Sequence, residues 1–181
     1  EGEPAVYAYY DGVDKVAHEY GLGTAYDTEL CFADRLVTEL LDRVPTGTTV
    51  IVVADHGQVD CRSGLVPIAS EVMEHVELLS GEGRFRWLHA RHGHEEELLS
   101  AASHCHGDAA WVQTRGGMVE EGWLGARAGS EVLGRLGDVA LLPFEPIAYH
   151  DPADGGPFEL IGRHGSMTED EMLVPCLAAT A

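Results

Sequence analysis

Two residues near the start of the chain, Asp14 and His18, have the side-chain chemistry and the separation of a metal-ligand pair. Residues four positions apart lie on the same side of a helix, so this carboxylate and this imidazole can reach one ion. The same separation is common among surface salt bridges. The pair therefore indicates either a metal site or an ordinary ion pair on a helix.

A second pair, Asp55 and His56, follows the run of β-branched residues at 48–54. That run predicts a central parallel strand covered on both faces. Ligands of open α/β sheets gather beyond the carboxyl ends of the strands, where these two side chains would lie. The alternative is a capped turn, in which Asp55 bonds backbone amides and Gly57 supplies a positive φ.

His164 lies in a glycine-flanked loop, between Gly162-Arg163 and Gly165, where the backbone can approach a ligand closely. With the two Asp-His pairs it makes a set of five nitrogen and oxygen ligands without thiolates. Such a set suits zinc or manganese at a catalytic site rather than a closed structural zinc site. Arg163 is, on position alone, a candidate for contact with a substrate phosphate.

Other positions with metal-like or basic character are weaker candidates. His104 and His106 are two residues apart, so on a helix they point to different faces. The one locally basic stretch, residues 84–94, could meet a substrate phosphate or an acidic partner. A solvated strand face is the commoner explanation for such a stretch.

Strand and helix patterns alternate along the chain, and these elements must position the candidate ligands. Short apolar and β-branched runs predict strands at residues 5–10, 48–54, 85–90, 110–114 and 139–149. Apolar spacing and turn signals predict helices after residue 11, at residues 28–44, 68–79, 95–104 and 132–136, and from residue 168 onward. Pro143 and Pro146 predict an edge or bulged position for the last strand. This order indicates a layered α/β fold, with residues 58–137 as an insertion or small α+β lobe.

The chain of 181 residues carries 31 acidic and 11 basic side chains, a net charge of −20, and Lys15 is its only lysine. Nucleic-acid binding depends on clustered Lys and Arg, so we expect no nucleic-acid polymer as a partner. Bound metal cations would then attract an anionic substrate.

No apolar run approaches the ~18 residues of a membrane span, and residues 1–4 do not resemble a signal peptide. Four separated cysteines predict reduced thiols in a cytoplasmic protein.

Three motifs in order, YYDGVDKVAHEYG, VIVVADHGQV and GRHGSMTEDEMLVPCLA, resemble the carboxyl-terminal part of the alkaline phosphatase superfamily. They are most similar to the type I phosphodiesterase/nucleotide pyrophosphatase family in its bacterial form. The resemblance runs from residue 6 to about residue 177. It implies that residues 1–181 form the carboxyl-terminal part of one catalytic domain, and part of an alkaline-phosphatase-like three-layer α/β/α sandwich.

In the family that the motifs resemble, two zinc ions lie at the carboxyl edge of a central sheet. By this resemblance Asp14, His18 and His164 would bind one ion, and Asp55 with His56 would bind the other. Two such cations can clamp a phosphoryl group, activate the attacking oxygen and stabilise the leaving oxygen. Zinc is the expected metal and manganese is the alternative, because these ligands accept both.

The resemblance also implies a hydrolase of phosphoric esters, of phosphodiesterase or nucleotide pyrophosphatase type, acting on a small-molecule phosphate ester. The family's nucleophilic Thr or Ser and a further Asp ligand precede the first motif, and nothing in residues 1–13 replaces them. We therefore expect a piece of a longer or processed protein, inactive or nearly so by itself. The alternatives are a non-catalytic metal-binding or partner-binding module on the same fold, or a phosphomutase or sulfatase. The sequence sets neither the leaving group nor the oligomeric state.

Overall fold

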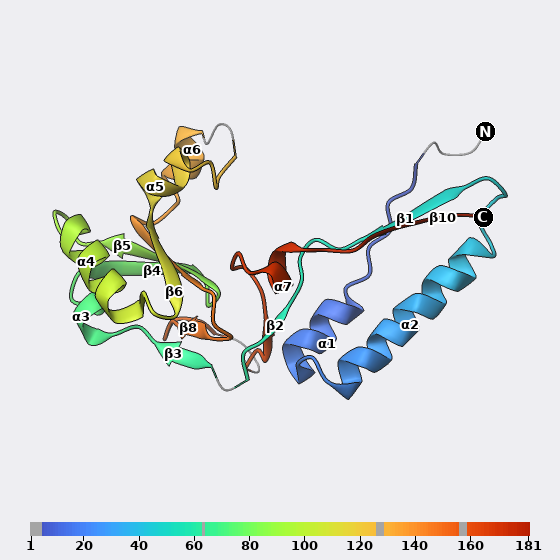
Figure 1. The fold of residues 1–181 in the computed structure, drawn as a ribbon, viewed down its shortest axis with the longest axis horizontal. Coiled ribbons are helices and arrows are strands. Elements are labelled where there is room, and N and C mark those ends of the chain that lie inside the picture. The colour runs from blue at the N-terminus through green and yellow to red at the C-terminus, as the bar shows by residue number, and fades with distance from the viewer. Residues whose placement is uncertain (1–4, 63, 126–128, 156–158) are drawn as a thin grey trace.

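The computed structural model describes residues 5–62, 64–125, 129–155 and 159–181 (Figure 1). Its helices are α1 (Gly12–Tyr20), α2 (Thr24–Leu41), α3 (Ser70–Met73), α4 (Glu95–His106), α5 (Arg115–Glu120), α6 (Ser130–Leu133) and α7 (Glu169–Met172). Its strands are β1 (Thr49–Val53), β2 (Val59–Asp60), β3 (Leu65–Pro67), β4 (Val76–Glu82), β5 (Phe85–Ala90), β6 (Ala110–Thr114), β7 (Val139–Pro143), β8 (Ala148–His150), β9 (Gly162–Arg163) and β10 (Cys176–Thr180). This mixture of helices and strands confirms the predicted α/β class.

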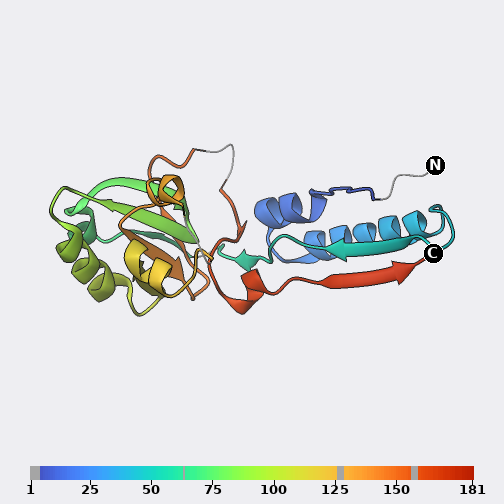
Figure 2. The ribbon, with the colours of Figure 1, turned by 90° about the horizontal axis from the view of Figure 1, so that it is seen from above.

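The molecule has two parts, which the two ribbon views separate clearly (Figures 1 and 2). The elongated part contains α1, α2, β1 and β10. The small lobe contains β3 to β8 together with α3 to α6. In Figure 1, β2 and α7 lie between the two parts, so the candidate ligand loops near them sit where the parts meet.

The small lobe holds the buried core, built on a four-stranded sheet in the order β4-β5-β7-β6 whose paired strands are all antiparallel. Successive residues of a strand face opposite sides of a sheet, so Leu141 and Leu142 enter different clusters. Leu141 packs with residues of α3 and α4, whereas Leu142 packs with Met118 of α5. Because helices cover both faces, every residue of β7 is buried. Each fully buried Leu or Val side chain contributes about 1.5–3 kcal/mol.

The elongated part differs from the prediction for residues 48–54. The strand exists as β1, but it pairs antiparallel with β10 rather than lying between parallel strands. Ile51 and Val53 are 63% and 61% exposed, so only alternate side chains of β1 are covered. The helix predicted at 28–44 begins earlier, as α2, and has no fully buried residue. Both elements therefore keep apolar side chains exposed in the structure, among them Phe32 and Leu36 of α2.

Three further predictions of elements were wrong. Residues 5–10 form no strand and are exposed. The stretch 68–79, predicted as one helix, divides into α3 and the first part of β4, because β4 forms a hairpin with β5. The helix predicted from residue 168 is the single turn α7; Pro175 disfavours helix just before it, and the chain continues as β10.

Other predictions agree closely with the structure. Residues 85–90 and 110–114 form β5 and β6 with the predicted bounds. The prolines at 143 and 146 divide the last predicted strand into β7 and β8. β7 is nevertheless an inner strand, paired with both β5 and β6, because Pro143 is its last residue and interrupts no ladder within it. Since β7 belongs to the lobe sheet and β8 pairs with β3, we propose that the small lobe extends beyond residue 137 to residue 150.

All four cysteines are free thiols in the structure, as their separation predicted: Cys31, Cys61, Cys105 and Cys176. Cys61 is buried, which raises the pKa of its thiol. Within the described ranges, no helix combines the length and the apolar character needed to cross a membrane.

A buried histidine gives the stability of the small lobe an expected pH dependence. His106, at the end of α4, accepts a hydrogen bond from the Ala69 N–H (3.2 Å) and packs edge-on against Tyr149. Burial lowers the pKa of His106 below its ordinary value of 6.5, so the unfolded chain binds this proton more readily. We expect the contribution of neutral His106 to the unfolding free energy to be complete above pH 6.5. This contribution should be lost as the pH falls from 6.5 toward the lower pKa that His106 has in the folded protein.

The check is urea unfolding of wild type and His106→Gln between pH 5 and pH 8. The variant should show a shallower loss of unfolding free energy below pH 6.5 than wild type. Equal slopes for the two proteins would mean that this buried imidazole is not a source of the acid sensitivity.

Candidate metal centre

Helix α1 presents Asp14 and His18 on one face, as their separation predicted. The distance from His18 Nε2 to Asp14 Oδ1 is 3.2 Å, and the two side chains are 19% and 33% exposed. His18 Nδ1–H donates to the carbonyl oxygen of Gly162 in β9 (2.6 Å). A carbonyl can only accept, so this bond fixes the tautomer and leaves Nε2 free as a ligand atom.

Strand β9 brings His164 to the same place from the far end of the chain. His164 Nε2 lies 3.9 Å from Asp14 Oδ1, and the ligand atoms of Asp14, His18 and His164 all lie within 4.8 Å of one another. Two atoms bound at about 2.1 Å to one tetrahedral ion are about 3.4 Å apart. The measured separations bracket that value, so these residues fit a divalent metal ion. Among the residues that the structure describes, no other three His, Cys, Asp or Glu side chains form such a group.

The second predicted pair lies beside this triad. The Nε2 atom of His56 is 3.9 Å from Asp14 Oδ1 and 3.6 Å from Asp55 Oδ1. The rings of His56 and His164 stack with their centroids 3.5 Å apart. Asp55 is 69% exposed and stands at the outer edge of the cluster. The structure thus brings all five predicted metal ligands to one place.

The imidazole of His164 is set up to be neutral. Burial lowers the pKa of His164, the nearby His56 and His18 rings lower it further, and Asp14 and Asp55 oppose the shift. Only a neutral imidazole has a lone pair for a metal ion. The local environment therefore favours the ligating form of His164 at neutral pH.

Gln58 is a contributor to the site that the sequence did not reveal. Its Nε2 donates to Asp14 Oδ1 (2.6 Å), which orients the carboxylate toward the histidines. The position follows directly after the Asp55-His56-Gly57 turn, yet a glutamine there has no chemical signature of its own. Its role depends on a contact across 44 residues of sequence.

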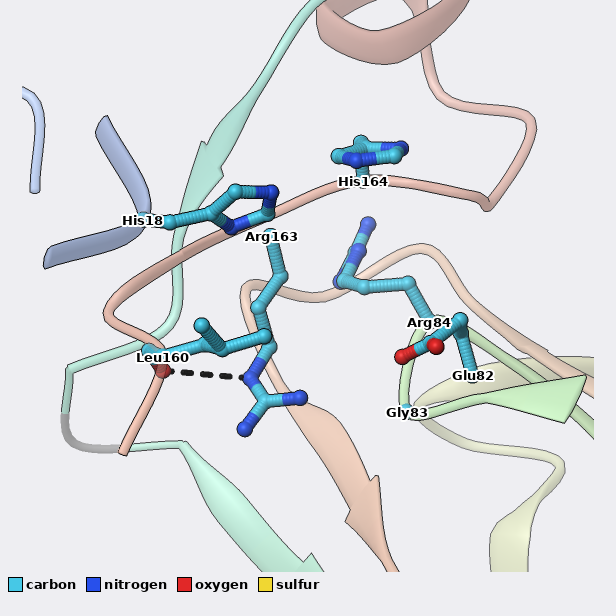
Figure 3. Close-up of a pocket in the computed structure, with 7 residues that line it drawn as sticks. All are labelled: His18, Glu82, Gly83, Arg84, Leu160, Arg163 and His164. Carbon is cyan, nitrogen blue, oxygen red and sulfur yellow. Dashed lines mark hydrogen bonds between the residues drawn. The ribbon is translucent and has the colours of Figure 1, made fainter. Parts of the chain in front are cut away.

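A small pocket of about 140 Å³ adjoins the triad (Figure 3). His18 and His164 line one side of it, and the β4–β5 turn of the small lobe lines another. Arg163 also lines it, and its Nε donates to the Leu160 carbonyl (3.2 Å). Within the described residues, its guanidinium has no carboxylate partner within 4.0 Å. The remaining guanidinium donors are therefore available to an anionic ligand.

The structure agrees with the prediction for the two histidines of α4 but not for the two arginines of the basic stretch. His104 is exposed and His106 is buried on α4, in line with the different faces expected of them, and neither belongs to the triad. The expectation that residues 84–94 form a solvated face was wrong for Arg84 and Arg86, which are 1% and 0% exposed. Both are buried because carboxylates compensate their charge: Glu171 pairs with Arg84, and Asp151 and Asp154 pair with Arg86.

Known structures share this fold at low sequence identity. Human ectonucleotide pyrophosphatase/phosphodiesterase 5 is 17% identical, with a TM-score of 0.62 over 91% of this chain and 44% of that chain. The murine protein, in an inactive variant bound to AMP, is 16% identical, with a TM-score of 0.63 over 91% and 44% of the two chains. Phosphonoacetate hydrolase from Sinorhizobium meliloti 1021, bound to phosphonoformate, is 18% identical, with a TM-score of 0.67 over 91% and 43%. The chain thus spans less than half the length of these proteins.

No curated protein matches the sequence significantly. The model of the family described as type I phosphodiesterase / nucleotide pyrophosphatase, however, matches residues 4–167. That match includes all three segments that carry the clustered Asp and His side chains. Together with the shared fold, it confirms the resemblance carried by the three sequence motifs: the chain belongs to the type I phosphodiesterase/nucleotide pyrophosphatase family, within the alkaline phosphatase superfamily.

Proposed function

We propose that the complete protein containing this chain is a metal-dependent hydrolase of phosphoric esters, of phosphodiesterase or nucleotide pyrophosphatase type. The observation that carries the proposal is the convergence of Asp14, His18 and His164 from two distant segments in a chain of this family. The triad would hold one divalent ion. Asp55 and His56 would hold a second, together with ligands from outside this chain. Zinc is the preferred metal and manganese the alternative.

A bound pair of ions would supply Lewis-acid activation of the phosphoryl group and stabilise the developing charge on its oxygens. The residues of this chain would hold and orient these ions. Gly162 holds the His18 ring through Nδ1, and Gln58 holds the Asp14 carboxylate. Such bonds to ligating side chains reduce the reorganisation needed when a metal binds.

The nucleophile, a Thr or Ser by family resemblance, would come from a segment that precedes this chain in the complete protein. Two observations support this division. The chain spans 43–44% of the similar structures. In addition, β1 and β10 expose Ile51, Val53 and Leu177 at 61–63%, and α2 exposes Phe32 and Leu36. We propose that the preceding part of the domain covers this apolar surface, and that the chain alone is inactive or nearly so.

The substrate would be a small-molecule phosphate ester rather than a nucleic-acid polymer. The net charge of −20 disfavours binding along a phosphate backbone. The similar proteins bind AMP in one case and phosphonoformate or phosphonoacetate in another. Those ligands share only their phosphoryl chemistry. We therefore propose the class of phosphate esters as substrates and no particular leaving group. Four free thiols support a cytoplasmic location, and the motifs support a bacterial source.

Arg163 would contact an anionic group of the substrate in the pocket beside the triad (Figure 3). We expect Arg163→Ala to raise KM by about 10- to 150-fold for substrates with a second acid group, because charge-assisted hydrogen bonds contribute about 1.5–3 kcal/mol. The kcat value should change little. Arg62→Ala is the matched control, since Arg62 is exposed and bonds Asp60 and the Tyr20 carbonyl instead. Equal KM values for Arg163→Ala and wild type would remove Arg163 from the substrate site.

Two alternatives share the same metal platform. A non-catalytic module would bind the metal without turnover. A phosphomutase or sulfatase would use the ligands for another transfer reaction. Neither has an observation in its favour that the hydrolase lacks.

The test is hydrolysis of bis(p-nitrophenyl) phosphate and p-nitrophenyl phosphate by the complete protein, after chelator treatment and again after addition of zinc or manganese. We expect loss of diester cleavage with the chelator and its restoration by metal. If metal restored cleavage of the monoester alone, the protein would be a phosphomonoesterase rather than a phosphodiesterase. Absence of turnover with metal bound would favour the non-catalytic module or a transfer reaction.

A further inference from the structure

Arg84, in the β4–β5 turn of the small lobe, is a charged side chain with no access to water. Its side chain is 0% exposed, and so a full set of hydrogen bonds must offset the loss of hydration. Nε donates to Glu171 Oε1 (2.8 Å) and Nη2 donates to Glu171 Oε2 (2.6 Å), which is a two-pronged ion pair. The other donors reach backbone carbonyls of Pro143, Glu145 and Ile147. All five N–H groups of the guanidinium are thereby used.

Glu171, in α7, is equally buried and equally saturated. Besides Arg84, its Oε1 accepts from the Ser166 N–H (2.9 Å) and its Oε2 accepts from the Thr168 hydroxyl (2.5 Å). Burial alone would raise the pKa of Glu171, but the bonds from Arg84 and Thr168 outweigh it and hold the pKa below its ordinary value. The carboxylate therefore fixes the backbone two residues after His164.

The backbone of α7 fixes the other ligand loop. The Gly57 N–H, directly after His56, donates to the Glu171 carbonyl oxygen (2.8 Å). The contact is so close that a Cβ on Gly57 would lie 1.9 Å from the Asp170 carbonyl oxygen. One residue, Glu171, thus bonds through its side chain to the His164 loop and through its backbone to the His56 loop.

We propose that Glu171, held by Arg84, is a positioning residue that sets the His56 and His164 loops against each other. The stacking of the His56 and His164 rings at 3.5 Å is the geometry that it maintains. Arg84 also ties this arrangement to the small lobe, through β7 and the segment that follows it. The inference rests on the proposed function only in that it takes His56 and His164, which these two loops carry, as metal ligands.

The test measures zinc affinity of the complete protein by competition with a chromogenic chelator. Glu171→Gln should bind zinc about 10–100-fold more weakly, as is typical when a group that supports metal ligands is changed. Arg84→Lys should give a similar loss, because an ammonium keeps the charge but cannot form the two-pronged pair. Glu169→Gln is the matched control, since Glu169 lies exposed in the same helix and should leave affinity unchanged.

Cobalt substitution separates positioning from stability. The visible absorption of bound Co²⁺ reports ligand geometry, so Glu171→Gln should alter this spectrum whereas Glu169→Gln should not. Thr168→Val, which removes only the hydroxyl bond to Glu171, is a milder variant should Glu171→Gln fail to fold, and we expect a several-fold loss of zinc affinity.

A lowered thermal midpoint with wild-type zinc affinity and an unchanged cobalt spectrum, in both Glu171→Gln and Thr168→Val, would overturn the positioning role and leave the metal centre intact. A wild-type protein that binds no zinc would instead overturn the metal centre, and the positioning role with it.

Discussion

Replacing His164 with alanine is expected to weaken zinc binding by about 100-fold or more and to abolish metal-restored ester hydrolysis in the complete protein. The imidazole is one of three ligand atoms that lie within 4.8 Å of one another. Loss of one of three protein ligands leaves a two-ligand site, and 100-fold corresponds to about 2.7 kcal/mol of binding free energy. Competition with a chromogenic chelator and steady-state kinetics measure the two effects separately.

The matched control is His104→Ala, which removes an exposed imidazole from α4 in the small lobe. Zinc affinity and turnover should remain at wild-type values in this variant. If His164→Ala kept both values as well, the triad would not be the metal site. If His104→Ala lost them, the relevant metal would lie in the lobe.

Replacing Gly162 with alanine is expected to damage the centre without touching a ligand. A Cβ at Gly162 would lie 2.4 Å from the Ala17 carbonyl oxygen, in the helix that carries Asp14 and His18. Backbone cannot move aside as a flexible side chain can, so α1 and β9 must separate. We expect a loss of about 1–3 kcal/mol in unfolding free energy from this overpacking. Zinc affinity should fall by about 10-fold or more, because the Gly162 carbonyl also holds the His18 ring.

Gly129→Ala controls for the loss of glycine itself. Its φ of −69° and ψ of 153° are accessible to alanine, and a Cβ there meets no atom of the described residues within 4 Å. Urea unfolding and zinc titration should give wild-type values for Gly129→Ala. Wild-type zinc affinity in Gly162→Ala would show that the contact between α1 and β9 does not set the ligand geometry.

The predictions that succeeded concern elements whose patterns are complete within a few residues. β5 and β6 have the predicted bounds because their own apolar and β-branched residues pair within a core formed by the lobe. The prediction of one helix at 68–79 was wrong because a short apolar run suits either a helix or a strand. The second half of this segment forms strand β4 because it pairs with β5 in a hairpin. The orientation of β1 depended on β10, more than 120 residues away.

The ligand set could be predicted because carboxylates and imidazoles carry their chemistry in their residue types. The residues that hold these ligands in position could not be predicted from the sequence. Gln58 and Glu171 are ordinary polar residues in sequence, and only long-range contacts with Asp14 and Arg84 give them a role. Arg84 itself looked like part of a solvated basic stretch, because a buried arginine is recognised only by the carboxylate that compensates its charge.

The most direct measurement is an anomalous difference map at the zinc absorption edge, from crystals of the zinc-loaded complete protein. We predict a peak bonded at about 2.0–2.2 Å to Asp14, His18 and His164. The strongest zinc peak at another histidine pair, such as His75 and His94, whose Nδ1 atoms lie 3.0 Å apart, with no peak at the triad, would contradict the proposed metal centre.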